Sequence, residues 1–432
     1  MNTERVYTVA SGRVASRKIG RAARWFVLTI LLARTAGAQT PVTDSLEQRL
    51  RRAEAAISVL QQQLADQSAS AVKAKSGAHV ELTGRVMVGG FGNSRRVNNV
   101  DNPQFVRPDT TTTGPVRGIG MAIRQTRLGL AARVPDVLGG AFTGDLDVDF
   151  YGGQQPSSGG RTFPLVRLRT ARGFVRWSHA ELMLGQESPL ISGVNPVTPA
   201  AIGTPEFAAA GNLWLWLPQL RVGVLTAGPV RMGAQVAVLA PTSGDAVAGF
   251  DTDYDLAERS QRPFVQARVH AEWGGNARDG GLQREIGCGV HQGWLVPVAA
   301  RVSSSAVACD ATIPVIEWLE LRGEFFAGRG LRGLGGGGIG QNFTGANDAL
   351  ESRGGWAQLN VRPAFEVRFG AGCGLDHPDA QALRRRNDAC SAYVMRGFGP
   401  VFFGGELRRL RTEYSGGRFT NDHVTLAAGF EF

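Results

Sequence analysis

Along most of the chain, apolar and polar residues alternate with a period of two, which is the pattern of a β-strand with two different faces. The C-terminus shows it most clearly, because one face there carries only apolar residues: Val424, Leu426, Ala428, Phe430 and Phe432. The segments 140–151, 262–274 and 364–373 repeat the alternation, with charged residues or Gly on the second face. No helical segments follow these strands to cover them, so the apolar face needs another partner.

The alternation predicts sixteen strands whose connections are long and short almost in turn. The predicted strands are 79–91, 119–134, 140–151, 164–177, 179–187, 212–226, 229–241, 262–274, 284–296, 299–312, 316–328, 354–362, 364–373, 390–398, 400–411 and 420–432. An even number of strands with short turns at one rim and long loops at the other is typical of a transmembrane β-barrel. Only a closed barrel pairs every backbone N–H and C=O group of its strands within lipid. We therefore expect an all-β fold, a 16-stranded antiparallel transmembrane β-barrel over residues 78–432.

The N-terminus has the three parts of an export signal. Five basic residues between Arg13 and Arg24 precede a short apolar core, Trp25–Ala33, and Ala36-Gly37-Ala38 offers a cleavage site. We expect residues 1–38 to be a signal peptide and the mature chain to begin at Gln39. The apolar core is too short to span a bilayer, and no other stretch of about 18 apolar residues exists, which argues against a helical membrane protein.

Residues 39–77 are predicted to form a periplasmic coiled-coil helix and a linker. The apolar positions of this segment are spaced alternately by four and three residues: Leu46, Leu50, Ala53, Ile57, Leu60 and Leu64. This is a heptad seam, which favours an oligomeric coiled coil, although a single amphipathic helix is the alternative. The small and polar residues 68–77 are typical of a linker.

Composition and charge exclude several other classes of protein. The formal net charge is +10, but residues 1–38 hold seven Arg or Lys and one Glu, so about +4 remains for the mature chain. A nucleic-acid partner is therefore not implied by the charge. The six His residues are scattered without metal-ligand spacing, and no Gly-x-Ser-x-Gly or Cys-x-x-Cys motif occurs. We expect no enzyme, no cofactor and no metal.

Several short motifs resemble those of a known porin group. They are Arg124-Gln-Thr-Arg-Leu-Gly-Leu130, Arg167-Leu-Arg169, Phe174-Val-Arg-Trp177, Leu184-Gly-Gln186, Gly354-Gly-Trp-Ala-Gln-Leu359 and Arg408-Arg-Leu-Arg-Thr412. With them the chain resembles the coiled-coil-bearing, trimeric DcaP-like and phosphate-selective porins of the bacterial outer membrane. The resemblance implies a homotrimer in outer-membrane lipid that lets small hydrophilic solutes diffuse. It also implies that Phe432 is the signal read by the barrel-assembly machinery. The alternative function is a structural outer-membrane anchor with an incidental pore.

The resemblance also implies that the third long loop folds into the barrel and narrows it. By the predicted strands that loop is Ser188–Gly211, which contains Pro196, Pro205 and a single charge, Glu206. Its proline content and low charge suit a segment that lies against the inner wall. A plain extracellular loop or a loop between subunits is the alternative.

Strand alternation assigns a set of charged residues to the pore lining. The predicted pore-lining residues are Arg127, Arg133, Asp145, Asp147, Asp149, Arg167, Arg169, Arg221, Arg231, Arg268 and Arg322. The three Asp residues lie between two strands that carry Arg and can pair with them. Arg221, Arg231 and Arg268 are expected to have fewer acidic neighbours, which predicts a weak preference for anions. Arg172 and Arg176 are out of phase with Arg167 and Arg169, which requires a β-bulge or a position at the rim.

Four cysteines in an exported chain meet an oxidising compartment. Cys373 and Cys390 are predicted to end one strand and begin the next, with the loop Gly374–Ala389 between them, and to form a disulfide. Cys288 and Cys309 oppose each other only if their hairpin is centred between Val298 and Ala299.

Overall fold

The structure is a computed structural model. It describes residues 51, 54, 58, 72–73, 78–109, 116–152, 164–245, 253–275, 282–363 and 366–432. The predicted signal peptide and nearly all of the predicted coiled coil and linker lie outside the described residues. The chain divides into two compact units, Met1–Val72 and Lys73–Phe432, and the second unit carries the fold discussed below.

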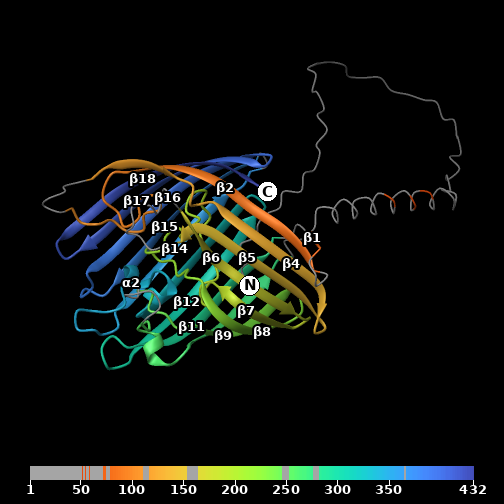
Figure 1. Cartoon of the computed structure of the whole chain (residues 1–432), viewed down its shortest axis with the longest axis horizontal. Helices are drawn as coiled ribbons and strands as arrows, with labels where there is room; N and C mark the ends of the chain where they lie inside the picture. Colours follow the sequence, from red (N-terminus) through yellow and green to blue (C-terminus); the bar gives the residue numbers. More distant parts are fainter. Residues whose placement is uncertain are drawn as a thin grey trace, which may run out of the picture. The chain divides into compact units, whose positions relative to one another are not determined.

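The second unit is a closed antiparallel β-barrel (Figure 1). Its strands are β2 (His79–Asn93), β3 (Gly118–Ala122), β4 (Arg127–Val137), β5 (Gly140–Gly152), β6 (Leu165–Arg176), β7 (Ala180–Glu187), β8 (Leu217–Leu225), β9 (Val230–Leu239), β10 (Phe264–Trp273), β11 (Arg284–Leu295), β12 (Val302–Ile316), β13 (Leu319–Arg329), β14 (Glu351–Val361), β15 (Val367–Pro378), β16 (Arg384–Phe398), β17 (Val401–Tyr414) and β18 (Gly417–Glu431). Each strand pairs with the next, except that β3 and β4 both pair with β2, and β18 pairs with β2 to close the ring. The remaining strand, β1 (Val72–Lys73), has two residues.

β3 and β4 are two parts of one interrupted strand. Both pair with β2, β3 through residues 89–93 of β2 and β4 through residues 79–85. The barrel therefore has 16 transverse strands, as the alternation predicts. Residues 123–126 form the interruption, and within it Arg124 and Gln125 are buried. The break turns both side chains toward the barrel interior.

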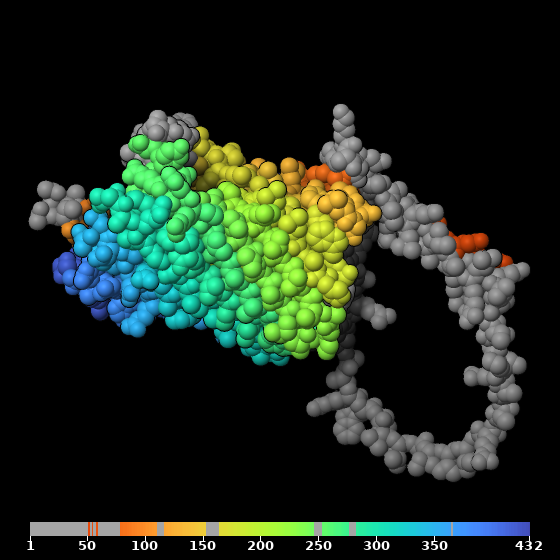
Figure 2. All heavy atoms as spheres, turned by 90° about the horizontal axis from the view of Figure 1, so that it is seen from below, coloured from red at the N-terminus to blue at the C-terminus, as the bar shows by residue number. Residues whose placement is uncertain are grey.

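The two faces of the wall have opposite character. On β8 the residues alternate strictly between buried and exposed, with Gln219 and Arg221 buried and Val222 and Val224 about half exposed. β9, β10 and β11 show nearly the same alternation, and Figure 2 shows neighbouring strands following one another in chain order across one face. On these strands apolar side chains face outward and polar side chains face inward, which is the reverse of a water-soluble core.

Some connections are shorter than predicted. The predicted loop Gly374–Ala389 is wrong, because β15 continues to Pro378 and β16 begins at Arg384, leaving a turn of residues 379–383. The polar residues that indicated a loop instead lie mostly on long strands: Asp376 and Asn387 are on the buried face, whereas Arg386 and Asp388 are partly exposed. In a barrel with a polar interior, charge does not mark the end of a strand.

Both cysteine pairs are disulfide-bonded. Cys373 lies opposite Cys390 in the β15–β16 ladder, and Cys288 lies opposite Cys309 in the β11–β12 ladder. The second hairpin is centred as its pairing requires, since Leu295 pairs with Val302. Each bridge joins neighbouring strands within the wall rather than closing a loop.

Helices are few and short in the described part of the second unit. They are η1 (Glu258–Ser260), η3 (Arg332–Leu334) and α2 (Gly337–Gly340). None of them has the length and apolar character needed to cross a membrane. The last two belong to the connection between β13 and β14.

Candidate functional site

The connection between β7 and β8, residues 188–216, lies inside the barrel. Most of its residues are buried, and Ile191 and Leu213 have no exposed surface. They pack against Phe264 of β10, Phe326 of β13 and Leu331 of the β13–β14 connection. Deeper in the loop, the Phe207 ring stacks on Trp356 of β14 at a centroid distance of 6.0 Å. This internal loop and the walls thus share an apolar core within the otherwise polar lumen, which is why the loop sequence is rich in Ala, Gly and Pro, with Pro196 and Pro205 both buried.

Side chains of the wall satisfy the backbone of the internal loop on the β10–β14 side. Gln266 accepts a hydrogen bond from the Ile191 N–H (3.3 Å), and Glu324 accepts one from the Ser192 hydroxyl (2.7 Å). Gln358 both accepts from the Val197 N–H (2.7 Å) and donates to the Val197 carbonyl (2.8 Å). A loop without strand partners must place its buried backbone groups on such side chains.

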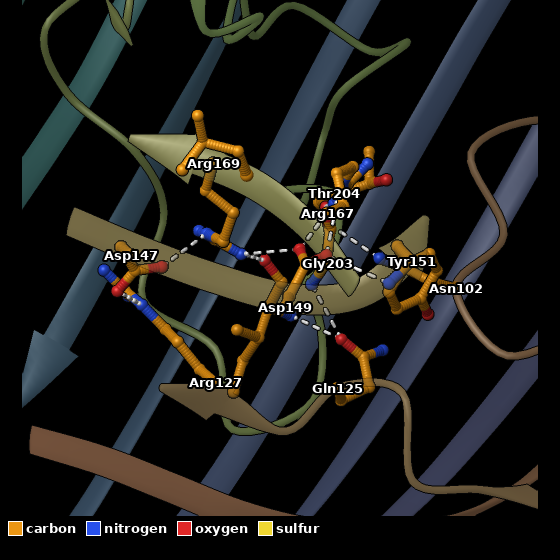
Figure 3. A network of polar contacts seen from close by, with 12 residues as sticks. Asn102, Gln125, Arg127, Asp147, Asp149, Tyr151, Arg167, Arg169, Gly203 and Thr204 are labelled. Carbon is orange, nitrogen blue, oxygen red and sulfur yellow. Dashed lines mark hydrogen bonds and ion pairs between the residues drawn. The ribbon is translucent and has the colours of Figure 1, made fainter. Parts of the chain in front are cut away.

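On the other side, residues of β6 and of the β3–β4 break hold the loop in the same way (Figure 3). Gln125 accepts hydrogen bonds from the backbone N–H groups of Ile202 (2.9 Å) and Gly203 (2.8 Å). Arg169 donates to the Ile202 carbonyl and Arg167 to the Gly203 carbonyl. The loop is therefore tied to opposite walls and crosses the lumen between them.

The same arginines neutralise the acidic row of β5. Asp149 pairs with Arg167 at 2.6 Å, and Asp145 pairs with Arg172 at 2.9 Å. Asp147 pairs with Arg169 at 3.1 Å and also with Arg127. Aromatic rings extend the network, since the Arg169 guanidinium lies 4.5 Å from the centre of the Trp216 ring. Charge pairing and cation–π contact together fix the direction of these side chains.

A β-bulge explains the phase change on β6. Asp147 pairs with Thr170, whereas the next residue, Val148, pairs with Leu168, so that Arg169 is an extra residue in the ladder. The bulge lets Arg167 and Arg169 face inward together with Arg172 and Arg176. Of the two alternatives left by the sequence, a bulge or a position at the rim, the structure has the bulge.

Glu206, the only charged residue of the predicted constriction loop, lies in a buried charge cluster with β17. Arg408 approaches Glu206 at 3.4 Å and Glu406 at 2.6 Å. Arg408 also donates to Asn102 Oδ1 and to the Pro103 carbonyl, both at 3.1 Å, and so connects the β2–β3 connection to the same cluster. Glu206 belongs to a loop and not to a spanning strand, and burial, followed by the charge of Glu406, raises its pKa to about 8. Burial thus favours the protonated form of Glu206.

The predicted basic row on β8–β10 is only partly free of acidic neighbours. Arg268 pairs with Glu285 at 3.2 Å and with Asp310, and Arg231 pairs with Glu272, so the expectation for these two arginines is wrong. The partners of Arg268 come from the following strands, β11 and β12, and the partner of Arg231 comes from the neighbouring strand β10. Arg221 differs, because it contacts Gln219 Oε1 (3.0 Å) and the Ser188 carbonyl (3.4 Å).

The remaining predicted residues lie apart from this cluster. Arg322 pairs with Glu320 at 2.7 Å and donates to the Asn195 carbonyl of the internal loop at 3.1 Å. Arg133 is exposed near the end of β4, at the distance limit of a contact with Glu81 (4.0 Å). Sequence reasoning missed Gln125, Gln358 and Arg408 as loop contacts. Nothing local in the sequence marks these residues as loop-binding.

In the part of the chain that the structure describes, no group of three or more His, Cys, Asp or Glu residues is arranged to hold a metal ion.

No family model matches the chain, and no curated protein matches it. Solved structures do. The outer membrane channel DcaP of Acinetobacter baumannii superposes with a TM-score of 0.64 at 16% identity, over 84% of this chain and 100% of that one. An anion-selective porin from Comamonas acidovorans gives 0.52 at 11% identity, over 82% and 100% of the two chains. Salmonella typhi OmpF in complex with daunomycin gives 0.51 at 9%, over 83% and 99%. The chain has the fold of these 16-strand porins.

Proposed function

We propose that the chain is an outer-membrane porin, a passive diffusion channel for small hydrophilic solutes. The observation that carries the proposal is the internal loop: residues 188–216 lie inside a closed barrel and are tied to opposite walls. A barrel that served only as an anchor has no need of a built constriction. The apolar outward face and the channels of the same fold support the outer-membrane location.

The test of the proposal is conductance. Purified protein added to a planar lipid bilayer should give stable, stepwise openings, and proteoliposomes should swell in isotonic solutions of small sugars. An outer-membrane anchor, the alternative, would insert without opening. Insertion without steps in a preparation that runs as a heat-modifiable folded barrel would contradict the porin proposal.

Arg221 supports a weak preference for anions. Its side chain is buried in the wall, and no carboxylate is paired with it among the described residues, in contrast to Arg231 and Arg268. An unpaired guanidinium leaves a positive potential near the passage, which favours anions. The anion-selective porin among the structures with this fold agrees with this assignment.

The Arg221→Gln variant should shift the reversal potential in a KCl gradient toward cations. The matched control is the double variant Arg231→Gln/Glu272→Gln, which removes one ion pair and leaves the net charge unchanged. We expect no shift for the control. If Arg221→Gln leaves the reversal potential where it is, Arg221 lies too far from the ion path to set selectivity.

We further propose a homotrimer whose assembly the predicted coiled coil, residues 46–64, assists. Deletion of residues 41–75 should lower the temperature at which the trimer dissociates in detergent, because a parallel coiled coil adds contacts between subunits. Deletion of the predicted linker alone, residues 68–75, is the control. Equal heat resistance of both deletions would make residues 46–64 a spacer.

Phe432 is proposed as the assembly signal. Its backbone exchanges hydrogen bonds with Gly84 of β2, donating at 3.0 Å and accepting at 2.9 Å, and so pairs the two strands that close the barrel. The side chain itself is half exposed on the outward face beside Phe430. A ring that contributes little to the core is available to the assembly machinery before the barrel closes.

A further inference from the structure

The outward face of β14–β18 carries a sector of charged residues where its apolar band ends. On β16–β18 the outward residues of the band lie opposite one another on neighbouring strands and so form rows across the wall. The row nearest to the long connections contains Ala392, Leu407 and Val424. The next outward row toward the end that carries the long connections contains Arg409 and Asp422, and the one after it contains Asp388 and Arg411. Along β17 and β18, one outward residue is apolar and the next outward residue is charged, as Leu407 and Arg409 are on β17.

A third row extends the sector across five neighbouring strands. Its members follow the ladder from β14 to β18: Arg353, His377, Arg386, Glu413 and Arg418. Over the three rows arginines outnumber carboxylates five to three. We call this surface the charged sector. By contrast, the outward positions near the same end of β8 and β9 are apolar, Pro218 and Ala240.

The ion pairs within the charged sector are open to solvent. Arg409 and Asp422 contact each other at 2.7 Å with 63% and 54% of their side chains exposed. Arg418 and Glu413 are 2.8 Å apart and also largely accessible. Such exposed pairs contribute little stability and exchange readily for another anion. Arg353 and Arg411 have no acidic partner among the described residues.

We propose that the charged sector binds the phosphorylated headgroup of an anionic lipid in the outer leaflet. The surface directly continues the apolar band of the outward face, so its rows would lie beside the headgroups when the band sits in the hydrocarbon core. Arginine suits phosphate because its planar guanidinium donates two parallel hydrogen bonds. The acyl chains of the same lipid would cover Leu407, Val424 and the apolar rows beyond them.

This inference rests on the outer-membrane location proposed above, but it does not require an open pore. Fractionation of the cell envelope tests the location separately. A chain that fractionates elsewhere would remove both proposals, whereas a chain in the outer membrane that fails to bind lipid would remove only this one.

The test uses full-length protein in detergent and lipid A, a diphosphorylated acylated disaccharide, as the probe, with bound lipid counted by native mass spectrometry. The variant Arg353→Gln/Arg409→Gln/Arg411→Gln should bind lipid A at least about tenfold more weakly than the unaltered protein. The control is Arg396→Gln, which alters an exposed arginine of β16 at the opposite end of the apolar band. Its affinity should not change.

A second measurement needs no variant. The unaltered protein should prefer lipid A over its dephosphorylated form, and inorganic phosphate should not displace the lipid, because the acyl chains contribute to binding. Equal binding of the two lipids would overturn the proposal. Displacement by phosphate would make the site one for a free anion, and dissociation of the trimer in the triple variant would make it a contact between subunits; either result would also overturn it.

Discussion

Replacing residues 196–211 of the internal loop with a Gly-Ser-Gly linker is expected to raise the single-channel conductance several-fold. The excised segment contains Pro196, Pro205, Glu206 and the stacked Phe207, which together fill the lumen between opposite walls. Its two ends already meet, since Asn212 donates to Asn195 Oδ1 at 3.1 Å. A short linker can therefore close the gap without pulling on the strands. Single-channel recording in planar bilayers measures the change.

The walls should tolerate this excision. Arg167 and Arg169 keep their pairs with the β5 aspartates, and Arg408 keeps Glu406. The control places the same linker at residues 345–348, an exposed stretch of the β13–β14 connection, and should leave the conductance unchanged. A folded loop variant that conducts like the unaltered protein would show that the narrowest part of the passage lies elsewhere, for instance at the buried connection that contains η3 and α2.

The second large effect is expected for Arg408→Met. The substitution leaves Glu406 in the buried interior without its ion pair, and it removes the donors to Asn102 and Pro103. Breaking a buried pair from one side costs about 3–5 kcal/mol. Urea unfolding of the detergent-solubilised barrel should show a loss of that order. Arg329→Met, which alters an exposed outward residue of β13, should change the stability by less than about 1 kcal/mol.

A double variant distinguishes the loss of the Arg408 charge from the loss of its packing and hydrogen bonds. Glu206 and Glu406 both approach Arg408, and burial raises the pKa of Glu206. Arg408→Met/Glu406→Gln removes the closer carboxylate together with the arginine, so it should recover much of the lost stability. Recovery by Glu206→Gln instead would show that Glu206 carries the charge that Arg408 balances, and recovery by neither would show that the hydrogen bonds to residues 102–103 dominate.

The architecture could be read from the sequence because a barrel wall repeats one local rule. Each strand alternates between an apolar and a polar face, and this periodicity is visible in segments such as 424–432 without knowledge of the neighbouring strands. The 16-strand antiparallel barrel is confirmed, and the interruption at residues 123–126 did not disturb the count because β3 and β4 share β2 as their partner. The predicted coiled coil lies outside the described residues and stays a prediction.

Strand ends were harder to predict for a physical reason. Asp376, Asn387 and Arg386 were assigned to a loop because charge normally marks solvent. In this barrel the interior is itself polar, and the long strands β15 and β16 carry charge on both faces beyond the apolar band. Local polarity therefore cannot distinguish a strand from a loop here.

By itself, the sequence determined which residues face each side of the wall, because that depends only on the period of two within each strand. Which inward charges meet was decided by the tertiary structure. Arg268 finds Asp310 two strands away, and Arg408 finds Glu206 on a loop about 200 residues distant, through strand register and the path of the internal loop. Register and loop path are set by long-range pairing of backbone and buried side chains, and no local pattern encodes that pairing.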